Sequence, residues 1–221
     1  MPAQRDNIGA MDLLPEQLRR YLDALVPARP AELAAMEAYG TEHNFPIIGP
    51  AAGQFCYLLA RLTGARQVFE LGSGYGYSTA WFARAVVENG GGVVHHVVWD
   101  EQLSQRARTH LATLGYGDVV QYHVGEAVAA LRGSAGPFDL IFNDIEKKDY
   151  PASLPVIEAT LRPGGMLVID NMLWSGRIFD DSDRSAHTEG VREMTRLLTT
   201  SDRWAASLVP IRDGLIVARR R

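Results

Sequence analysis

The chain has 221 residues, of which 47% are hydrophobic and 22% charged, and its net charge is −4 at pH 7. This length and composition predict one globular domain over residues 1–221 and exclude a disordered chain. The acidic balance excludes a basic field over the whole molecule, although a local basic patch for nucleic acid remains open. The single cysteine, Cys56, cannot build a disulfide framework, which favours a reducing compartment.

The start of the chain lacks the pattern of a targeting signal. Residues 1–10 are polar, and no apolar run approaches the ~18 residues that cross a bilayer. We therefore expect a cytoplasmic protein that does not associate with membranes. The next segments predict helices, because apolar residues recur at spacings of three and four over 18–25, and further helices are expected over 31–39 and 51–62. Residues 1–65 should form a helical extension packed on the rest of the domain.

From residue 67 onward, short apolar runs alternate with longer amphipathic stretches. The expected strands are 68–71, 93–98, 119–123, 138–142 and 166–169, and the expected helices are 77–88, 101–114, 127–131, 152–161 and 191–198. Strands that alternate with helices predict a parallel sheet with helices on both faces.

The end of the chain predicts a different connection. Two apolar runs, 204–209 and 215–218, are separated only by 210–214, which is too short for a helical crossover, so they should pair as an antiparallel hairpin. The expected architecture is a Rossmann-like α/β fold with a seven-stranded, mostly parallel sheet that ends in this hairpin. Such a sheet resembles that of class I methyltransferases.

A glycine-rich segment follows the first expected strand. It reads Glu70-Leu71-Gly72-Ser73-Gly74-Tyr75-Gly76, and glycines at such a place let the backbone turn tightly and approach a ligand closely. A nicotinamide-dependent oxidoreductase would need glycine at position 77, where Tyr77 stands, so that alternative is disfavoured. Asp100, at the end of the second strand, is a candidate acceptor for ribose hydroxyls, with a helix cap as the alternative.

Two further strands end in oxygen donors. Asp144 follows the strand at 138–142, and Asp170 and Asn171 follow the strand at 166–169, so all should emerge at the edge that holds the glycine loop. Two carboxylates and an amide oxygen form a hard site that suits Mg²⁺, Mn²⁺ or Ca²⁺ better than zinc. The alternative is that both aspartates cap the helices that follow them.

Together these segments resemble the cation-dependent O-methyltransferase family, which includes catechol and caffeoyl-CoA O-methyltransferases. The matching stretches are Glu70 to Ala80, Phe138 to Tyr150, Arg162 to Gly176 and Pro210 to Val217. The most specific part combines Asp144-x-x-Lys147-x-x-Tyr150 with Gly164-Gly165…Asp170-Asn171-x-Leu173-Trp174-x-Gly176. The resemblance implies a methyl transfer from S-adenosylmethionine (SAM), assisted by a divalent metal, to a hydroxyl of a catechol-like small molecule with neighbouring oxygens.

The resemblance also implies roles for individual residues. Lys147 would be the general base and would act with Asp144, while Asp144, Asp170 and Asn171 would bind Mg²⁺, Mn²⁺ or Ca²⁺. The cofactor-binding residues would be Ile48, Glu70, Gly72, Ser73, Gly74, Tyr77, Ser78, Asp100, Glu126, Ala127 and Asp144. The family's ribose-binding acid falls on Val98, so either Asp100 substitutes for it or the ribose is held less tightly. Family members are commonly homodimers, which we also expect here.

One branch of this resemblance leads to a different acceptor. The segments Tyr21–Leu25, Arg29–Pro30 and Glu42–Ile47 look like bacterial enzymes that methylate 5-hydroxyuridine in transfer RNA. Those enzymes carry a basic insertion where this chain has the acidic residues 179–183, which would repel a phosphate backbone. Transfer RNA therefore stands as the alternative acceptor to a small molecule.

Overall fold

The computed structural model describes residues 15–221, so the expectation for residues 1–10 lies outside the described part. Its helices are α1 (Glu16–Ala24), α2 (Ala31–Glu42), α3 (Gly49–Leu62), α4 (Tyr77–Glu88), α5 (Glu101–Thr113), α6 (Ala127–Gly133), α7 (Tyr150–Thr160) and α8 (Ala186–Thr200). Its strands are β1 (Gln67–Leu71), β2 (Val93–Val98), β3 (Val120–Val124), β4 (Phe138–Asn143), β5 (Leu161–Ile169), β6 (Trp204–Val209) and β7 (Leu215–Arg220). Short 3₁₀ turns occupy η1 (Gly117–Val119), η2 (Lys147–Asp149) and η3 (Trp174–Phe179).

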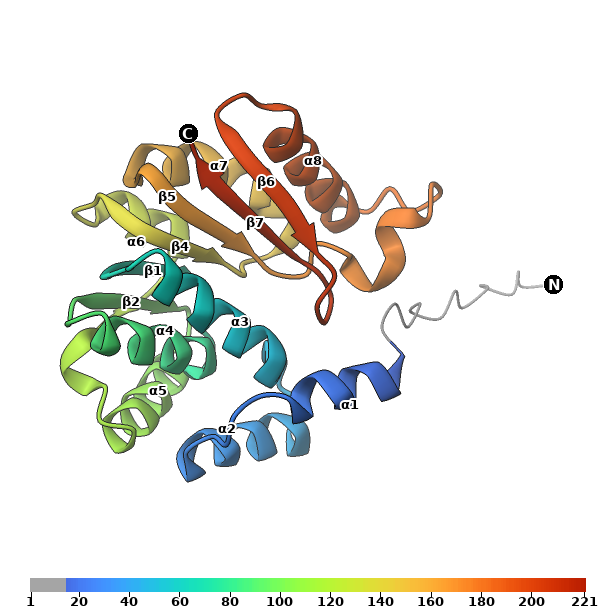
Figure 1. The fold of residues 1–221 in the computed structure, drawn as a ribbon. Coiled ribbons are helices and arrows are strands. Elements are labelled where there is room, and N and C mark those ends of the chain that lie inside the picture. Colours follow the sequence, from blue (N-terminus) through green and yellow to red (C-terminus); the bar gives the residue numbers. More distant parts are fainter. Residues whose placement is uncertain (1–14) are drawn as a thin grey trace.

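The strands form one seven-stranded sheet in the order β3-β2-β1-β4-β5-β7-β6. The pairs from β3 to β5 are parallel, whereas β7 runs antiparallel to both β5 and β6. This confirms the α/β class and the C-terminal hairpin expected from the sequence. The hairpin turn consequently lies at the edge of the sheet where β4 and β5 end (Figure 1).

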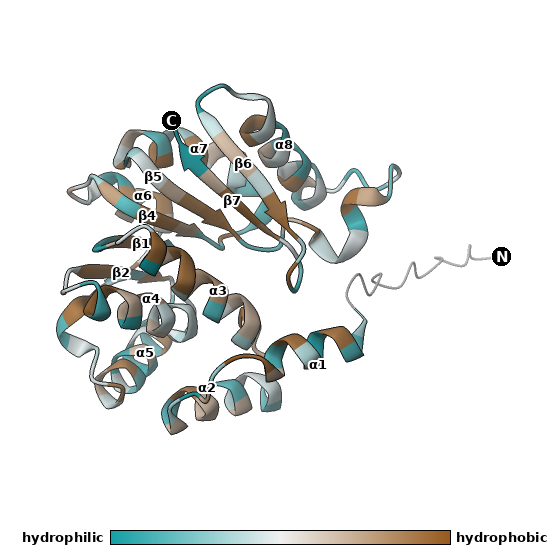
Figure 2. Ribbon diagram, in the orientation of Figure 1, coloured by the Kyte–Doolittle hydropathy of each residue, from teal (hydrophilic) through white to brown (hydrophobic). Residues whose placement is uncertain are grey.

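Helices cover both faces of the sheet, and each face has its own apolar core (Figure 1). Trp81 and Phe82 of α4 pack with residues of α3 and α5 on one face. Ile157 of α7 and Met194 of α8 pack with α6 on the other. Because the central strands are buried on both sides, they are almost continuously hydrophobic, as Figure 2 shows.

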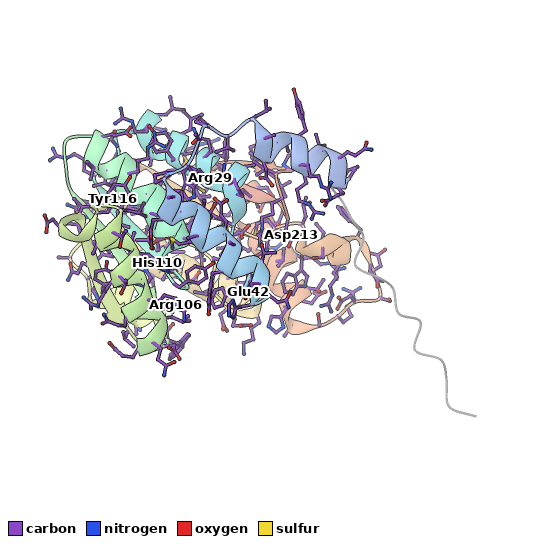
Figure 3. The ribbon with its side chains drawn as sticks, turned by 90° about the horizontal axis from the view of Figure 1, so that it is seen from below. Arg29, Glu42, Arg106, His110, Tyr116 and Asp213 are labelled. Carbon is purple, nitrogen blue, oxygen red and sulfur yellow. The ribbon has the colours of Figure 1, made fainter. Side chains whose placement is uncertain are left out.

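The N-terminal helices contribute unequally to the fold. In α2, Glu32 Oε1 lies 2.5 Å from His110 Nδ1 of α5, and the Arg106 guanidinium lies 4.1 Å from the centre of the Tyr39 ring. Figure 3 shows Arg106 and His110 beside α2. In contrast, α1 has no buried residue. It is joined to α3 by a hydrogen bond of 3.1 Å from the Ala51 amide to Asp23 Oδ1.

Some boundaries differ from the sequence expectation. Helix α8 begins at Ala186 instead of 191, because the Ser185 hydroxyl accepts a hydrogen bond from the Thr188 amide and caps the helix. Leu161, expected to end a helix, is the first residue of β5. Cys56 is fully buried. Within residues 15–221, no helix is both long and apolar enough to span a membrane.

Candidate active site

The glycine loop connects β1 to α4 and lies against the end of β4. Gly72 has a φ of +86°, and a Cβ atom there would lie 2.5 Å from the carbonyl oxygen of Asp144. A Cβ on Gly74 would lie 3.2 Å from the Phe45 ring. Glycine is therefore required at Gly72 both for the backbone conformation and for the close approach of two strand ends.

Glu70, the buried acid before this loop, has one unsatisfied oxygen. The Thr79 hydroxyl donates to Oε2, while Oε1 is buried and accepts from no group among the described residues. Burial raises the pKa of Glu70 to about 7, although hydrogen bonds from neighbouring hydroxyls oppose this shift. An acceptor left unpaired in the interior is costly, so this oxygen is suited to a donor on a bound ligand.

Two adjoining cavities open around the glycine loop. The smaller, of about 40 Å³, is lined by Phe45, Pro46, Ile47, Ile48, Gly72, Ser73, Gly74, Tyr75, Tyr77, Ser78 and Asp144. The larger, of about 420 Å³, is lined by Pro46, Gly72, Val97, Val98, Trp99, Gly125, Ala127, Asp144, Ile145, Glu146, Lys147, Asn171, Trp174 and Arg212. Pro46, Gly72 and Asp144 line both, so the loop and the carboxylate cluster face one continuous site.

The carboxylate cluster lies where β4 and β5 end side by side. Asp144 accepts a hydrogen bond of 2.9 Å from Lys147 Nζ. Asp170 is 1% exposed, and its backbone carbonyl accepts a hydrogen bond of 3.0 Å from the Tyr150 hydroxyl. Burial and the nearby charge of Asp170 raise the pKa of Asp144 to about 6. Neither carboxylate accepts from the first amides of a following helix, so the capping alternative is not what the structure shows.

Arg212, a residue that the sequence reasoning missed, completes this cluster. It lies in the turn between β6 and β7, and its Nη1 donates to Asp170 Oδ2 at 2.7 Å. The neighbouring Asp213 accepts from Asn171 Nδ2 at 3.0 Å and from the Ser175 amide at 2.6 Å. The sequence identified this segment as a hairpin turn and as a stretch that resembles the family, but it gave Arg212 no role. Nothing local reveals that β7 pairs with β5 and brings the turn to the site.

The donor set suits a hard cation chemically, but the side chains as they lie do not fit one. Asp170 Oδ1 accepts from the Asn171 amide at 2.8 Å and Oδ2 accepts from Arg212, so both oxygens are engaged. One oxygen of Asp144 is engaged by Lys147. The Arg212 guanidinium therefore pairs with one of the expected ligands, Asp170.

The residues expected around the nucleoside divide into two groups. Asp100 caps α5, because Oδ1 accepts from the Leu103 amide at 2.9 Å. Glu126 similarly caps α6 and does not line either cavity. Val98 and Ala127 do line the larger cavity. The cap alternative thus holds for Asp100, while its contact with a ribose stays a prediction.

Comparisons with known proteins agree with this geometry. Residues 31–221 match a family described as O-methyltransferase. A catechol O-methyltransferase from Niastella koreensis is 30% identical over 214 residues, which cover 92% of this chain and 96% of that protein. The solved O-methyltransferase from Bacillus cereus in complex with SAH is 26% identical, with a TM-score of 0.83 over 93% of this chain and 97% of that one. TomG from Streptomyces achromogenes, solved in complex with SAM, is 28% identical, with a TM-score of 0.82 over 92% and 96%.

Proposed function

Because this chain belongs to the O-methyltransferase family and is a SAM-dependent enzyme, we propose that it methylates one of two neighbouring oxygens on a small aromatic acceptor such as a catechol. One observation carries the proposal: the glycine loop and the pair of Lys147 and Asp144 face the same continuous site. A methyl donor held on the loop and a hydroxyl held beside the lysine would be reacting neighbours.

The smaller cavity fits the amino-acid end of SAM. Gly72 allows the backbone to approach a ligand, and Glu70, whose Oε1 is unpaired, lies directly behind this loop at the end of β1. Ile48, Ser73, Gly74, Tyr77 and Ser78 line this cavity and would complete the contact. When bound, SAM supplies a methyl group on a positively charged sulfur, whose bond electrons stay with the neutral thioether that leaves.

The larger cavity would take the nucleoside of SAM, beside Val98 and Ala127, together with a small aromatic acceptor beside Lys147. Its volume of about 420 Å³ lies within the range common for small-molecule sites. Trp99 and Trp174 provide aromatic walls, whereas Lys147 and Arg212 provide positive charge on the lining. An aromatic ring against the Trp174 indole, with its oxygens toward Lys147 and Arg212, would satisfy both parts of this surface.

Lys147 is the group of this chain that is placed to take the proton of the acceptor. In its neutral form it would accept the hydroxyl proton at Nζ, and the oxygen would keep the electron pair of the broken O–H bond. Asp144 holds the amine at 2.9 Å and would hold the resulting ammonium in the same place. The oxyanion thus formed is a stronger nucleophile than the hydroxyl.

Other parts of the sequence prediction stay predictions. A divalent ion at Asp144, Asp170 and Asn171 stays an expectation from the sequence, because the side chains as they lie do not fit it. A homodimer, a cytoplasmic location and the transfer RNA acceptor are likewise expectations from the sequence alone.

A screen of acceptors with methyl-labelled SAM tests the proposal. The purified protein would be incubated with catechol, with phenol as the matched acceptor that lacks the second oxygen, and with bulk transfer RNA. We expect label in catechol and far less in phenol. Label in transfer RNA with none in catechol would contradict the acceptor, and a protein that binds no SAM by calorimetry would contradict the whole proposal.

A further inference from the structure

Arg212 holds a backbone conformation that is uncommon for its residue type. Its φ is +52°, in the left-handed region that an arginine seldom occupies. The two residues that follow Arg212 are fixed by hydrogen bonds. The Met172 amide donates to the Gly214 carbonyl, and the Leu173 amide donates to the Asp213 carbonyl. Surrounding contacts therefore hold Arg212 in a strained conformation, which is a recurrent feature of functional sites.

The guanidinium of Arg212 is anchored at one end and free at the other. Nη1 donates to the buried Asp170, and within residues 15–221 no other hydrogen bond of this side chain is formed. The side chain is 29% exposed and lines the larger cavity, to which its remaining N–H donors are available. A buried carboxylate thus fixes a cation whose other donors face the space for the acceptor.

Three carboxylates, of Asp170, Asp144 and Asp213, lie near this arginine. Asp144 and Asp170 face Lys147 and Arg212 through the two ion pairs, of 2.9 Å and 2.7 Å. A divalent ion on Asp170 would have to displace the guanidinium from a carboxylate that is 1% exposed, and it would then lie beside a like charge. The turn that carries Arg212 is held by hydrogen bonds to residues 172–175.

We propose that Arg212 takes the place of a divalent metal in this enzyme: its guanidinium binds the two neighbouring oxygens of the acceptor and stabilises the oxyanion, so that methyl transfer needs no metal ion. The guanidinium is planar and presents paired N–H donors, which match two adjacent oxygens. A preorganised cation beside a developing oxyanion supplies the electrostatic help that a metal would otherwise give. This inference rests on the proposed function for the identity of the acceptor.

Two measurements on the same protein test the inference. Manganese binding is followed by electron paramagnetic resonance with Mn²⁺ alone, and methyl transfer to catechol is measured after dialysis against EDTA, with and without added Mg²⁺. We expect the wild-type enzyme to keep its rate in EDTA and to bind no Mn²⁺ at millimolar concentration. Arg212→Gly, which relieves the strained φ, should lose about 10²-fold or more in kcat and should gain Mn²⁺ binding at the vacated carboxylates.

Arg184→Gly is the matched control, since Arg184 is a loop arginine that is 71% exposed and pairs with Glu189. It should behave as the wild type in both measurements. Wild-type activity that is lost in EDTA and restored by Mg²⁺, or tight Mn²⁺ binding to the wild type, would overturn the inference. If no acceptor is methylated at all, the proposed function fails, yet the Mn²⁺ titration still decides between arginine and metal at this site.

Discussion

Lys147 Nζ lies 2.9 Å from Asp144 Oδ1, and the same nitrogen lies 5.6 Å and 5.8 Å from the ring centres of Tyr150 and Trp174. The amine is thus held by one carboxylate and two aromatic rings, and the side chain is only 13% exposed. Such an anchored amine loses little conformational entropy when an acceptor binds beside it. Its position, and not merely its charge, distinguishes it from surface lysines.

Replacing Lys147 should impair chemistry without impairing cofactor binding. For Lys147→Met, we expect kcat to fall by about 10²-fold or more, the usual contribution of a positioned base, while the dissociation constant for SAM stays unchanged. The measurement is steady-state methyl transfer together with calorimetric titration of SAM. Lys148→Met, at the exposed neighbour, is the control and should keep the wild-type kcat. An unchanged rate in Lys147→Met would remove the lysine from the mechanism.

Replacing Gly72 should impair cofactor binding. In Gly72→Ala, the added Cβ meets the Asp144 carbonyl oxygen at 2.5 Å, so the loop must move away from the end of β4. We expect SAM affinity to fall by about ten-fold or more, which corresponds to about 1.4 kcal/mol or more. Gly115→Ala is the matched control, because Gly115 also has a positive φ, of +78°, but a Cβ there meets nothing within 4 Å.

Both alanine variants should lose about 1 kcal/mol of stability from the left-handed backbone alone, as measured by urea denaturation. Only Gly72→Ala should lose SAM affinity. Equal SAM affinity in the two variants would mean that the loop does not hold the cofactor.

Replacing Asp100 separates the two interpretations that the sequence left open, a ribose acceptor and a helix cap. Since its carboxylate caps α5, Asp100→Ala should cost about 1 kcal/mol of stability and leave SAM affinity unchanged. Ser185→Ala, which removes the cap of α8 at Ser185, is the control for a pure capping loss. If Asp100→Ala weakened SAM binding while Ser185→Ala did not, Asp100 would be the ribose acid that the sequence lacks at Val98.

Much of the site was predictable because its signals are local. The alternation of strands and helices, the glycine loop and the position of Asp144 and Asp170 at strand ends all follow from periodicity and the geometry of parallel sheets. Arg212 was not predictable in this way. It reaches Asp170 only because β7 pairs with β5, so its role depends on residues more than 40 positions apart in the chain. Non-local pairing leaves no pattern within the segment itself.

The pH dependence of stability should carry a signature of His95 in β2. Its Nδ1 lies 3.0 Å from His123 Nε2, and burial, together with the charge of His123, lowers the pKa of His95 from 6.5 to about 4. The unfolded chain therefore binds this proton more tightly than the folded protein does. The contribution of His95 to the free energy of unfolding is complete above pH 6.5 and is lost as the pH falls toward 4. At pH 5 the free energy of unfolding is lower by about 2 kcal/mol on account of this residue.

The stability of the wild-type protein alone will not isolate the effect of His95, because the titration of Glu70 changes the free energy of unfolding in the opposite direction. Its pKa is raised to about 7, so protonation of Glu70 stabilises the fold as the pH falls below that value. The informative quantity is the difference between wild type and His95→Gln, measured as the free energy of unfolding in urea from pH 7.5 to 5. The variant should lose about 2 kcal/mol less than the wild type over this range. His43→Gln, at an exposed histidine, should follow the wild type, and parallel curves for all three proteins would show that His95 does not titrate as its burial requires.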